Sequence, residues 1–251
     1  SIAAMVGGLS GVANAQAVVT DTVGARVISN NAAFGGLKSP ADLRADSIAA
    51  NQANPYPAAA QNLTIASTGI GHVLVVPYFT TQGTNATLLN LVNTDQKNGK
   101  AVKLRFRGAS NSDDLFDITV FLSPGDVWAA NVSANGELSA LTTNDTSCTL
   151  PSAAQIKETF GKFSTNRVLN NAAAETREGY IEILNMADIP PAAGADKLFT
   201  AIKHVAGKAP CTQAVMDLQA NPLSAADPAN TPVARGYSWP TGGLMANWTG
   251  L

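Results

Sequence analysis

The chain has 251 residues with a formal net charge of −2, and 45% of its residues are hydrophobic. It is long enough to bury a core, and it has no net field that would steer it to nucleic acid or to an anionic membrane surface. Only 14% of the residues are charged and 6% are aromatic. A neutral surface rich in hydroxyl and amide side chains is the style of secreted bacterial proteins, and we expect no nucleic-acid partner.

Residues 1–15 look like a cleavable export signal. A mildly apolar run is followed by Ala13-Asn14-Ala15, which matches the small-residue pattern of a signal-peptidase site. If the leader were retained, Gly7 and Gly11 would allow a close helix contact that buries it. The run is too short to cross a bilayer and no later apolar stretch is long enough, so we expect no membrane span.

Residues 16–62 are expected to form an N-terminal arm with a strand and a short helix. Val19, Val23 and Val27 recur in a β-prone stretch. A strand here can pair with the open sheet edge of a neighbouring copy, or it can fold back onto its own domain, and the sequence leaves both open. Ser39-Pro40 has the residue types of a helix start and predicts a short helix directly after it.

Residues 63–251 are expected to form one mainly β domain. Short apolar runs separated by turn residues predict an antiparallel β-sandwich of immunoglobulin-like character, and helical periodicity from Pro151 onwards predicts a few short helical insertions. Asn98-Gly99 predicts a two-residue hairpin. Pro77 within an apolar run predicts an edge position or a β-bulge. The strand-like tail stops at Leu251, which we expect not to be the natural C-terminus.

Charged side chains concentrate in the stretch 99–128. Successive side chains of a strand point to opposite faces, so the stretch has an apolar and a charged face. The apolar set is Val102, Leu104 and Phe106; the charged set is Lys103, Arg105 and Arg107, with Lys100 nearby; Asp117, Thr119 and Phe121 point outward in the next run. Acids and bases that meet across paired strands form exposed ion pairs. We therefore expect the water-facing side of a sheet and not an anion-binding site.

The two cysteines, Cys148 and Cys211, are expected to form a disulfide. An even pair in an exported protein favours this pairing. Closing a loop of this length stabilises a fold by ~4 kcal/mol in the chain-entropy account. The spacing fits neither a C-x-x-C redox motif nor a zinc knuckle, and two free buried thiols are the alternative.

Sequence motifs for catalysis and cofactor binding are absent. The chain has no phosphate-binding glycine loop, no G-x-S-x-G elbow and no zinc-protease motif, so we expect no catalytic residue, no cofactor and no metal site. Loop aspartates such as Asp95 lack the spacing of a calcium loop. His72 is expected in a turn and His204 near a helix C-terminus. Glu178 and Glu182 share a strand face and are the one pair weighed as glycosidase carboxylates.

The runs 74–94, 101–108, 116–128 and 176–183 resemble a group of exported, β-rich proteins of Gram-negative bacteria that are described as cell-surface proteins. They are also similar in rhythm to immunoglobulin-like modules. The resemblance implies a β-rich fold and a location at the cell surface or outside the cell, and its motifs are structural. It brings no active residue with it.

The leading hypothesis is therefore a non-enzymatic extracellular structural protein. It would be a subunit of a surface filament or surface layer, a homopolymer assembled partly through the arm strand with Val19, Val23 and Val27. The first alternative is a monomeric secreted binding module or adhesin that recognises a glycan or protein through the loop 108–114. The second alternative is a secreted glycoside hydrolase that uses the pair Glu178 and Glu182.

Overall fold

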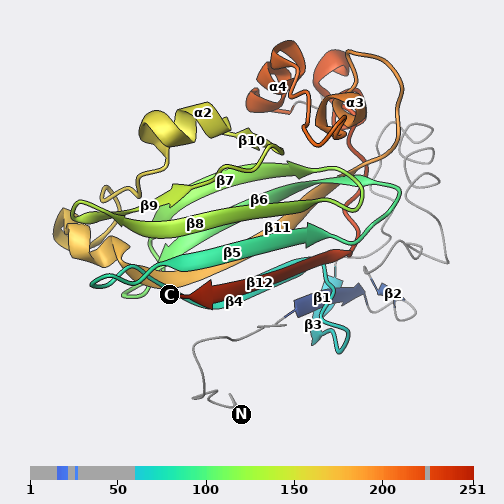
Figure 1. The fold of residues 1–251 in the computed structure, drawn as a ribbon. Helices are drawn as coiled ribbons and strands as arrows, with labels where there is room; N and C mark the ends of the chain where they lie inside the picture. Colours follow the sequence, from blue (N-terminus) through green and yellow to red (C-terminus); the bar gives the residue numbers. More distant parts are fainter. Residues whose placement is uncertain (1–15, 22–25, 28–59, 224–226) are drawn as a thin grey trace.

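The strands pack as a two-layer antiparallel sandwich (Figure 1). The structure, a computed structural model, describes residues 16–21, 26–27, 60–223 and 227–251. The predicted mainly β sandwich with short helices is confirmed, and its immunoglobulin-like character stays a prediction. The predicted leader, Val23 and the helix predicted after Pro40 lie outside the described residues.

The first sheet has eight strands, in the order β10-β7-β6-β11-β4-β1-β2 with β3 paired to β1. Their bounds, in chain order, are β1 (Gln16–Asp21), β2 (Arg26–Val27), β3 (Ala60–Ile65), β4 (Val73–Thr80), β6 (Gly99–Gly108), β7 (Asp114–Leu122), β10 (Cys148–Leu150) and β11 (Glu178–Ile189). The described part of the arm folds onto its own chain, because β1 pairs with β3 along its length and with the first residues of β4. This is one of the two alternatives that the sequence left open. Val19 lies opposite Leu63, and Val27 lies opposite Thr20.

The second sheet has four strands in the order β12-β5-β8-β9. Their bounds are β5 (Thr87–Asn93), β8 (Val127–Asn135), β9 (Leu138–Thr142) and β12 (Leu244–Gly250). Since β5 and β6 lie in different sheets, the hairpin predicted at Asn98-Gly99 is wrong. Gly99 starts β6, and the preceding loop carries the chain across the end of the sandwich. In this loop the Asn93 side chain accepts a hydrogen bond from the backbone N–H of Asp95, and the Asp95 carboxylate accepts one from the backbone N–H of Asn98.

Apolar side chains from both sheets fill the space between the layers. Trp128, Phe79 and Phe106 are fully buried there. Phe163 comes from the segment that follows Pro151, and its ring centroid lies 5.0 Å from that of Phe106 and 5.8 Å from that of Phe79. The sandwich is therefore completed by a residue from outside its strands.

Seven short helical segments interrupt the strand order within the described chain. They are α2 (Ala153–Gln155), η1 (Ile156–Phe160), η2 (Leu169–Asn171), η3 (Ala173–Thr176), α3 (Leu198–Ile202), α4 (Gln213–Ala220) and η4 (Pro228–Asn230). Figure 1 shows α3 and α4 above one end of the sheets. They cover Phe121 and Ala101 on the outer face of the first sheet and form a second small core around Cys148. Phe121 faces away from the sandwich as predicted, but the helices bury its side chain from solvent.

Two local predictions are confirmed in this frame. The disulfide joins Cys148 of β10 to Cys211, next to α4. A β-bulge occurs at Pro77: Phe79 lies opposite Gly179 and Val76 opposite Ile181, so two residues of β4 face one residue of β11.

Candidate functional site

The charged stretch forms an ion-pair face on the outer side of the first sheet, as predicted. Arg105 lies opposite Asp117 in the β6–β7 ladder. The Lys103 ammonium lies 3.1 Å from the Asp117 carboxylate, and Arg107 Nε lies 3.1 Å from Glu182 Oε2. These side chains are partly exposed, which places the network in contact with water. We call this set, Lys103, Arg105, Arg107, Asp114, Asp117 and Glu182, the ionic face.

The two carboxylates weighed for glycoside hydrolysis are spaced along one strand. Glu178 and Glu182 are four residues apart on one strand, so their Cα atoms lie about 13 Å apart along β11. Glycosidase carboxylates lie about 5–5.5 Å or 6.5–9.5 Å apart. Both groups also have structural partners, because Tyr78 donates to Glu178 at 3.0 Å and Arg107 donates to Glu182.

His204 connects the segment that follows α3 to two loops of the sandwich, through Ser123 and Thr146. It lies just beyond the end of α3, close to its predicted position. Its Nδ1 lies 3.1 Å from Ser123 Oγ and 3.3 Å from Asp126 Oδ2, and its Nε2 lies 3.3 Å from the Thr146 hydroxyl. The order Thr146, His204, Asp126 has the connectivity of a proton relay, but the Thr146 hydroxyl donates to the carbonyl of Gly207 at 3.1 Å. The contacts therefore tie loops together.

The loop proposed for adhesion, 108–114, lies at the end of the first sheet opposite to His204. Gly108 N–H donates to the carbonyl of Asp113 at 2.9 Å, and Ala109 N–H donates to the backbone carbonyl of Glu178 at 3.0 Å. The Ser110 hydroxyl donates to the carboxylate of Glu175. These bonds stabilise the loop backbone, and they pair several polar groups of the loop with other groups of the same chain.

The densest polar cluster is buried at the other end of the sandwich, around Lys100. The sequence grouped Lys100 with the water-facing charges, and the structure corrects this, because its side chain is 0% exposed. The physical reason is strand alternation: Lys100 is an even number of residues from Val102 and Leu104, so it shares their inward face. Its Nζ lies 2.9 Å from Asp188 Oδ1 and 3.6 Å from Asp95 Oδ2.

A β-bulge brings two polar residues of β11 to this cluster. The register of β11 against β6 shifts between Asn185 and Ala187. Residues three apart in a regular strand face opposite sides, but the bulge turns both Asn185 and Asp188 inward. Asn185 Nδ2 donates to Asp188 Oδ1 at 2.8 Å, and Asp188 lies directly opposite Lys100 in the ladder.

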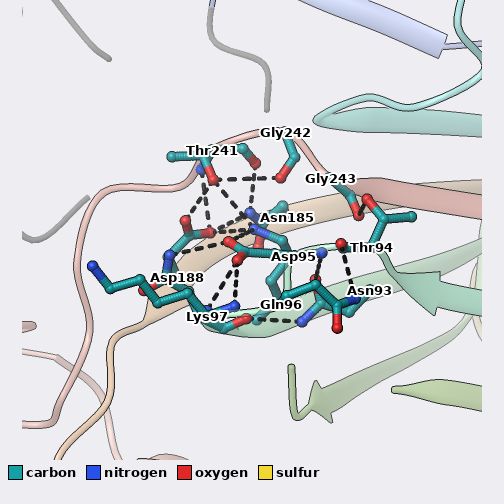
Figure 2. A network of polar contacts seen from close by, with 12 residues as sticks. Asn93, Thr94, Asp95, Gln96, Lys97, Asn185, Asp188, Thr241, Gly242 and Gly243 are labelled. Carbon is teal, nitrogen blue, oxygen red and sulfur yellow. Dashed lines mark hydrogen bonds and ion pairs between the residues drawn. The ribbon is translucent and has the colours of Figure 1, made fainter. Parts of the chain in front are cut away.

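The segment before β12 closes the cluster. The Thr241 hydroxyl donates to Asp188 Oδ2 at 2.5 Å, and its backbone N–H donates to Oδ1 at 3.2 Å. Gly243 has φ +100°, and a Cβ atom at this residue would lie 3.2 Å from Lys100 Cε. A glycine is therefore favoured both by the backbone and by the tight contact with the lysine stem. Figure 2 shows Asp95, Asn185, Asp188 and the 241–243 segment converging from separate parts of the chain.

Asp95 is fixed by its own loop. Its carboxylate accepts hydrogen bonds from the backbone of Lys97 at 2.8 Å and of Asn98 at 3.0 Å. Burial works to raise the pKa of Asp95, but these bonds and the Lys100 ammonium outweigh it and hold the pKa below its ordinary value. The loop therefore presents a carboxylate anion to the buried lysine.

His72 borders the cluster at the start of β4. Its backbone carbonyl accepts from the backbone N–H of Asn185 at 3.1 Å, which suits the predicted turn position. Burial lowers the pKa of His72 despite the neighbouring Asp188 carboxylate. The imidazole is therefore neutral at neutral pH.

Neither a metal centre nor a related protein adds a function to this geometry. Within residues 16–21, 26–27, 60–223 and 227–251, no group of three or more His, Cys, Asp or Glu side chains is placed to hold a metal ion. No helix in the described chain has the length and apolarity that crossing a membrane requires. No family model, no curated protein and no solved structure matches this chain.

Proposed function

We propose that this chain is a non-enzymatic structural subunit of an extracellular assembly, built by strand addition between copies. The observation that carries the proposal is the edge strand β12. It pairs in register with β5 from Leu244 to Gly250, without a bulge. Its sequence LMANWTG holds no proline and no charged residue, two of the devices that proteins use to protect a sheet edge.

The backbone geometry of β12 supports strand addition. Leu244 exchanges two hydrogen bonds with Gly71 on the side away from β5, both at 2.9 Å. The N–H groups of an antiparallel strand alternate in direction, so those of Ala246, Trp248 and Gly250 also point away from β5. Among the described strands, none pairs with β12 on this side beyond the Gly71 bridge.

Three other strands, β9, β10 and β4, are less suited than β12 to accept a strand. Backbone bonds from Leu141 to Gly161 and from Phe163 to Ser139 cover β9, the opposite edge of the second sheet. In the first sheet, β10 is three residues long and β4 is interrupted by Pro77. The donor strand we propose is the arm strand of a neighbouring copy, β1 with Val19, which would exchange its pairing with β3 of its own chain for pairing with β12.

The test compares two lysine substitutions in the full chain. Thr249→Lys puts a charge on β12, whereas Thr142→Lys is the matched control on β9, whose edge is covered. Sedimentation velocity and electron microscopy over a range of concentrations should show assembly of the wild type and of Thr142→Lys, and dispersed particles for Thr249→Lys. Dispersed wild-type particles at every concentration would defeat the assembly and favour the adhesin, and assembly of Thr249→Lys would defeat the role of β12.

A further inference from the structure

The Lys100–Asp188 pair has the geometry of a reactive pair as well as of an ion pair. The two residues lie directly opposite each other on adjacent antiparallel strands, and Nζ lies 2.9 Å from Oδ1. Both side chains are 0% exposed. Holding two groups at contact distance gives an intramolecular reaction a large effective concentration, and two buried charges lose their desolvation cost when they combine into a neutral group.

We propose that Lys100 and Asp188 condense into an intramolecular amide that cross-links β6 to β11. The lysine nitrogen forms a bond to Asp188 Cγ, and the bond from Cγ to Oδ2 breaks. Two of the three ammonium protons leave with Oδ2 as one water molecule, so the ion pair becomes an amide plus water. No oxidant, reductant or further reactant enters the step.

The surrounding groups supply what this condensation needs. The Thr241 hydroxyl lies 3.2 Å from Nζ and 2.5 Å from Oδ2, on the direct path for a proton between the amine and the departing oxygen. Asp95, 3.6 Å from Nζ, is the second carboxylate and can hold a proton between the two transfers. Donors from Asn185 Nδ2 and from the Thr241 backbone point at Oδ1, where negative charge develops in the tetrahedral intermediate.

The ionic face provides an internal comparison. Lys103 Nζ lies 3.1 Å from Asp117 Oδ2, a contact as short as many hydrogen bonds. That pair is about one third exposed, and water there competes with the amine and favours the separated charges. The condensation is therefore specific to the buried pair and does not depend on whether the protein assembles.

Peptide mapping of the purified wild-type protein tests the proposal without any variant. Trypsin cannot cleave after an acylated lysine, so the expected product is a branched peptide that joins residues 98–103 to residues 178–197. Its mass should equal the sum of the two peptides less one water, and fragmentation should place the link at Lys100 and Asp188. The bond after Lys103 should be cleaved normally.

Three results would overturn the inference or part of it. Free cleavage after Lys100, with both peptides at their sequence masses, would show that the pair stays ionic. A branched peptide lighter by one ammonia would assign the link to Asn185 instead of Asp188. The near-isosteric Thr241→Val variant should retain a larger unlinked fraction early after purification, and a fraction equal to wild type would remove Thr241 from the proton path.

Discussion

Replacing Phe163 with alanine should destabilise the protein by about 3–5 kcal/mol, the cost of deleting a large core side chain and leaving a cavity. Phe163 is 1% exposed. Its ring contacts three others, at centroid distances of 5.8 Å to Phe79, 5.0 Å to Phe106 and 5.4 Å to Phe116. Burial of a phenylalanine contributes about 1.5–3 kcal/mol, and each aromatic pair adds about 0.5–1.5 kcal/mol. The upper half of the range is therefore expected.

Urea unfolding of the oxidised protein, followed by tryptophan fluorescence, measures this change. A loss of that size lowers the urea midpoint by about 1–2 M at an ordinary dependence on urea. Leu169→Ala is the control, because Leu169 belongs to the same insertion but is 61% exposed, and its change should stay within about 0.5 kcal/mol. A loss below about 1 kcal/mol for Phe163→Ala would refute the view that the segment after Pro151 completes the core.

Three further changes follow from the disulfide, the half-buried His72 and the ionic face. Removing the disulfide with Cys148→Ser and Cys211→Ser should cost ~4 kcal/mol in urea unfolding, because the bond closes a separation of 63 residues; a change under ~1 kcal/mol would contradict this. Burial lowers the pKa of His72 below 6.5, so the unfolded chain binds the proton first and stability should fall as pH drops below that value. His72→Gln should reduce this loss, and an unchanged pH profile would count against it. Glu182→Gln should cost about 0.2–1 kcal/mol in low salt and less in high salt, while the same cost at both would show that salt ions do not screen the pair of Arg107 and Glu182.

Features set by local alternation could be predicted from the sequence. The pairing of Arg105 with Asp117 follows from the two-residue period of a strand, and the bulge at Pro77 follows from the missing N–H of proline. The prediction of the disulfide required only an even cysteine count and the expectation of export. Each inference used residues close in sequence or a pair with no competitor.

The buried cluster could be predicted only in part. The same alternation predicts that Lys100 points inward, but the charged residues around it in the sequence drew attention to the outer face. Its partners were not available, because Asp188 and Thr241 lie 88 and 141 residues away along the chain. The bulge at Asn185 also reverses the alternation just before Asp188, and nothing local marks it.

The cluster also connects the proposed docking strand to the centre of the first sheet. Thr241 lies three residues before β12, and its hydroxyl donates to Asp188 on β11. Thr94 reinforces the link, because its backbone N–H and its hydroxyl both donate to the carbonyl of Gly243, at 2.8 Å and 2.9 Å. The start of β12 is therefore fastened to both sheets.

If this fastening holds β12 in place, Thr241→Val should loosen that strand selectively. In protein whose Lys100–Asp188 pair is still ionic, the variant keeps the side-chain shape and removes a hydrogen bond to the Asp188 carboxylate, which contributes about 1.5–3 kcal/mol. Amide hydrogen exchange over residues 244–250 should accelerate about tenfold to a hundredfold, because each 1.4 kcal/mol is a factor of ten in the opening equilibrium. Exchange in β9, at the far edge of the same sheet, is the reference and should not change. Equal acceleration in both strands would mean that Thr241 stabilises the whole sandwich and does not anchor β12.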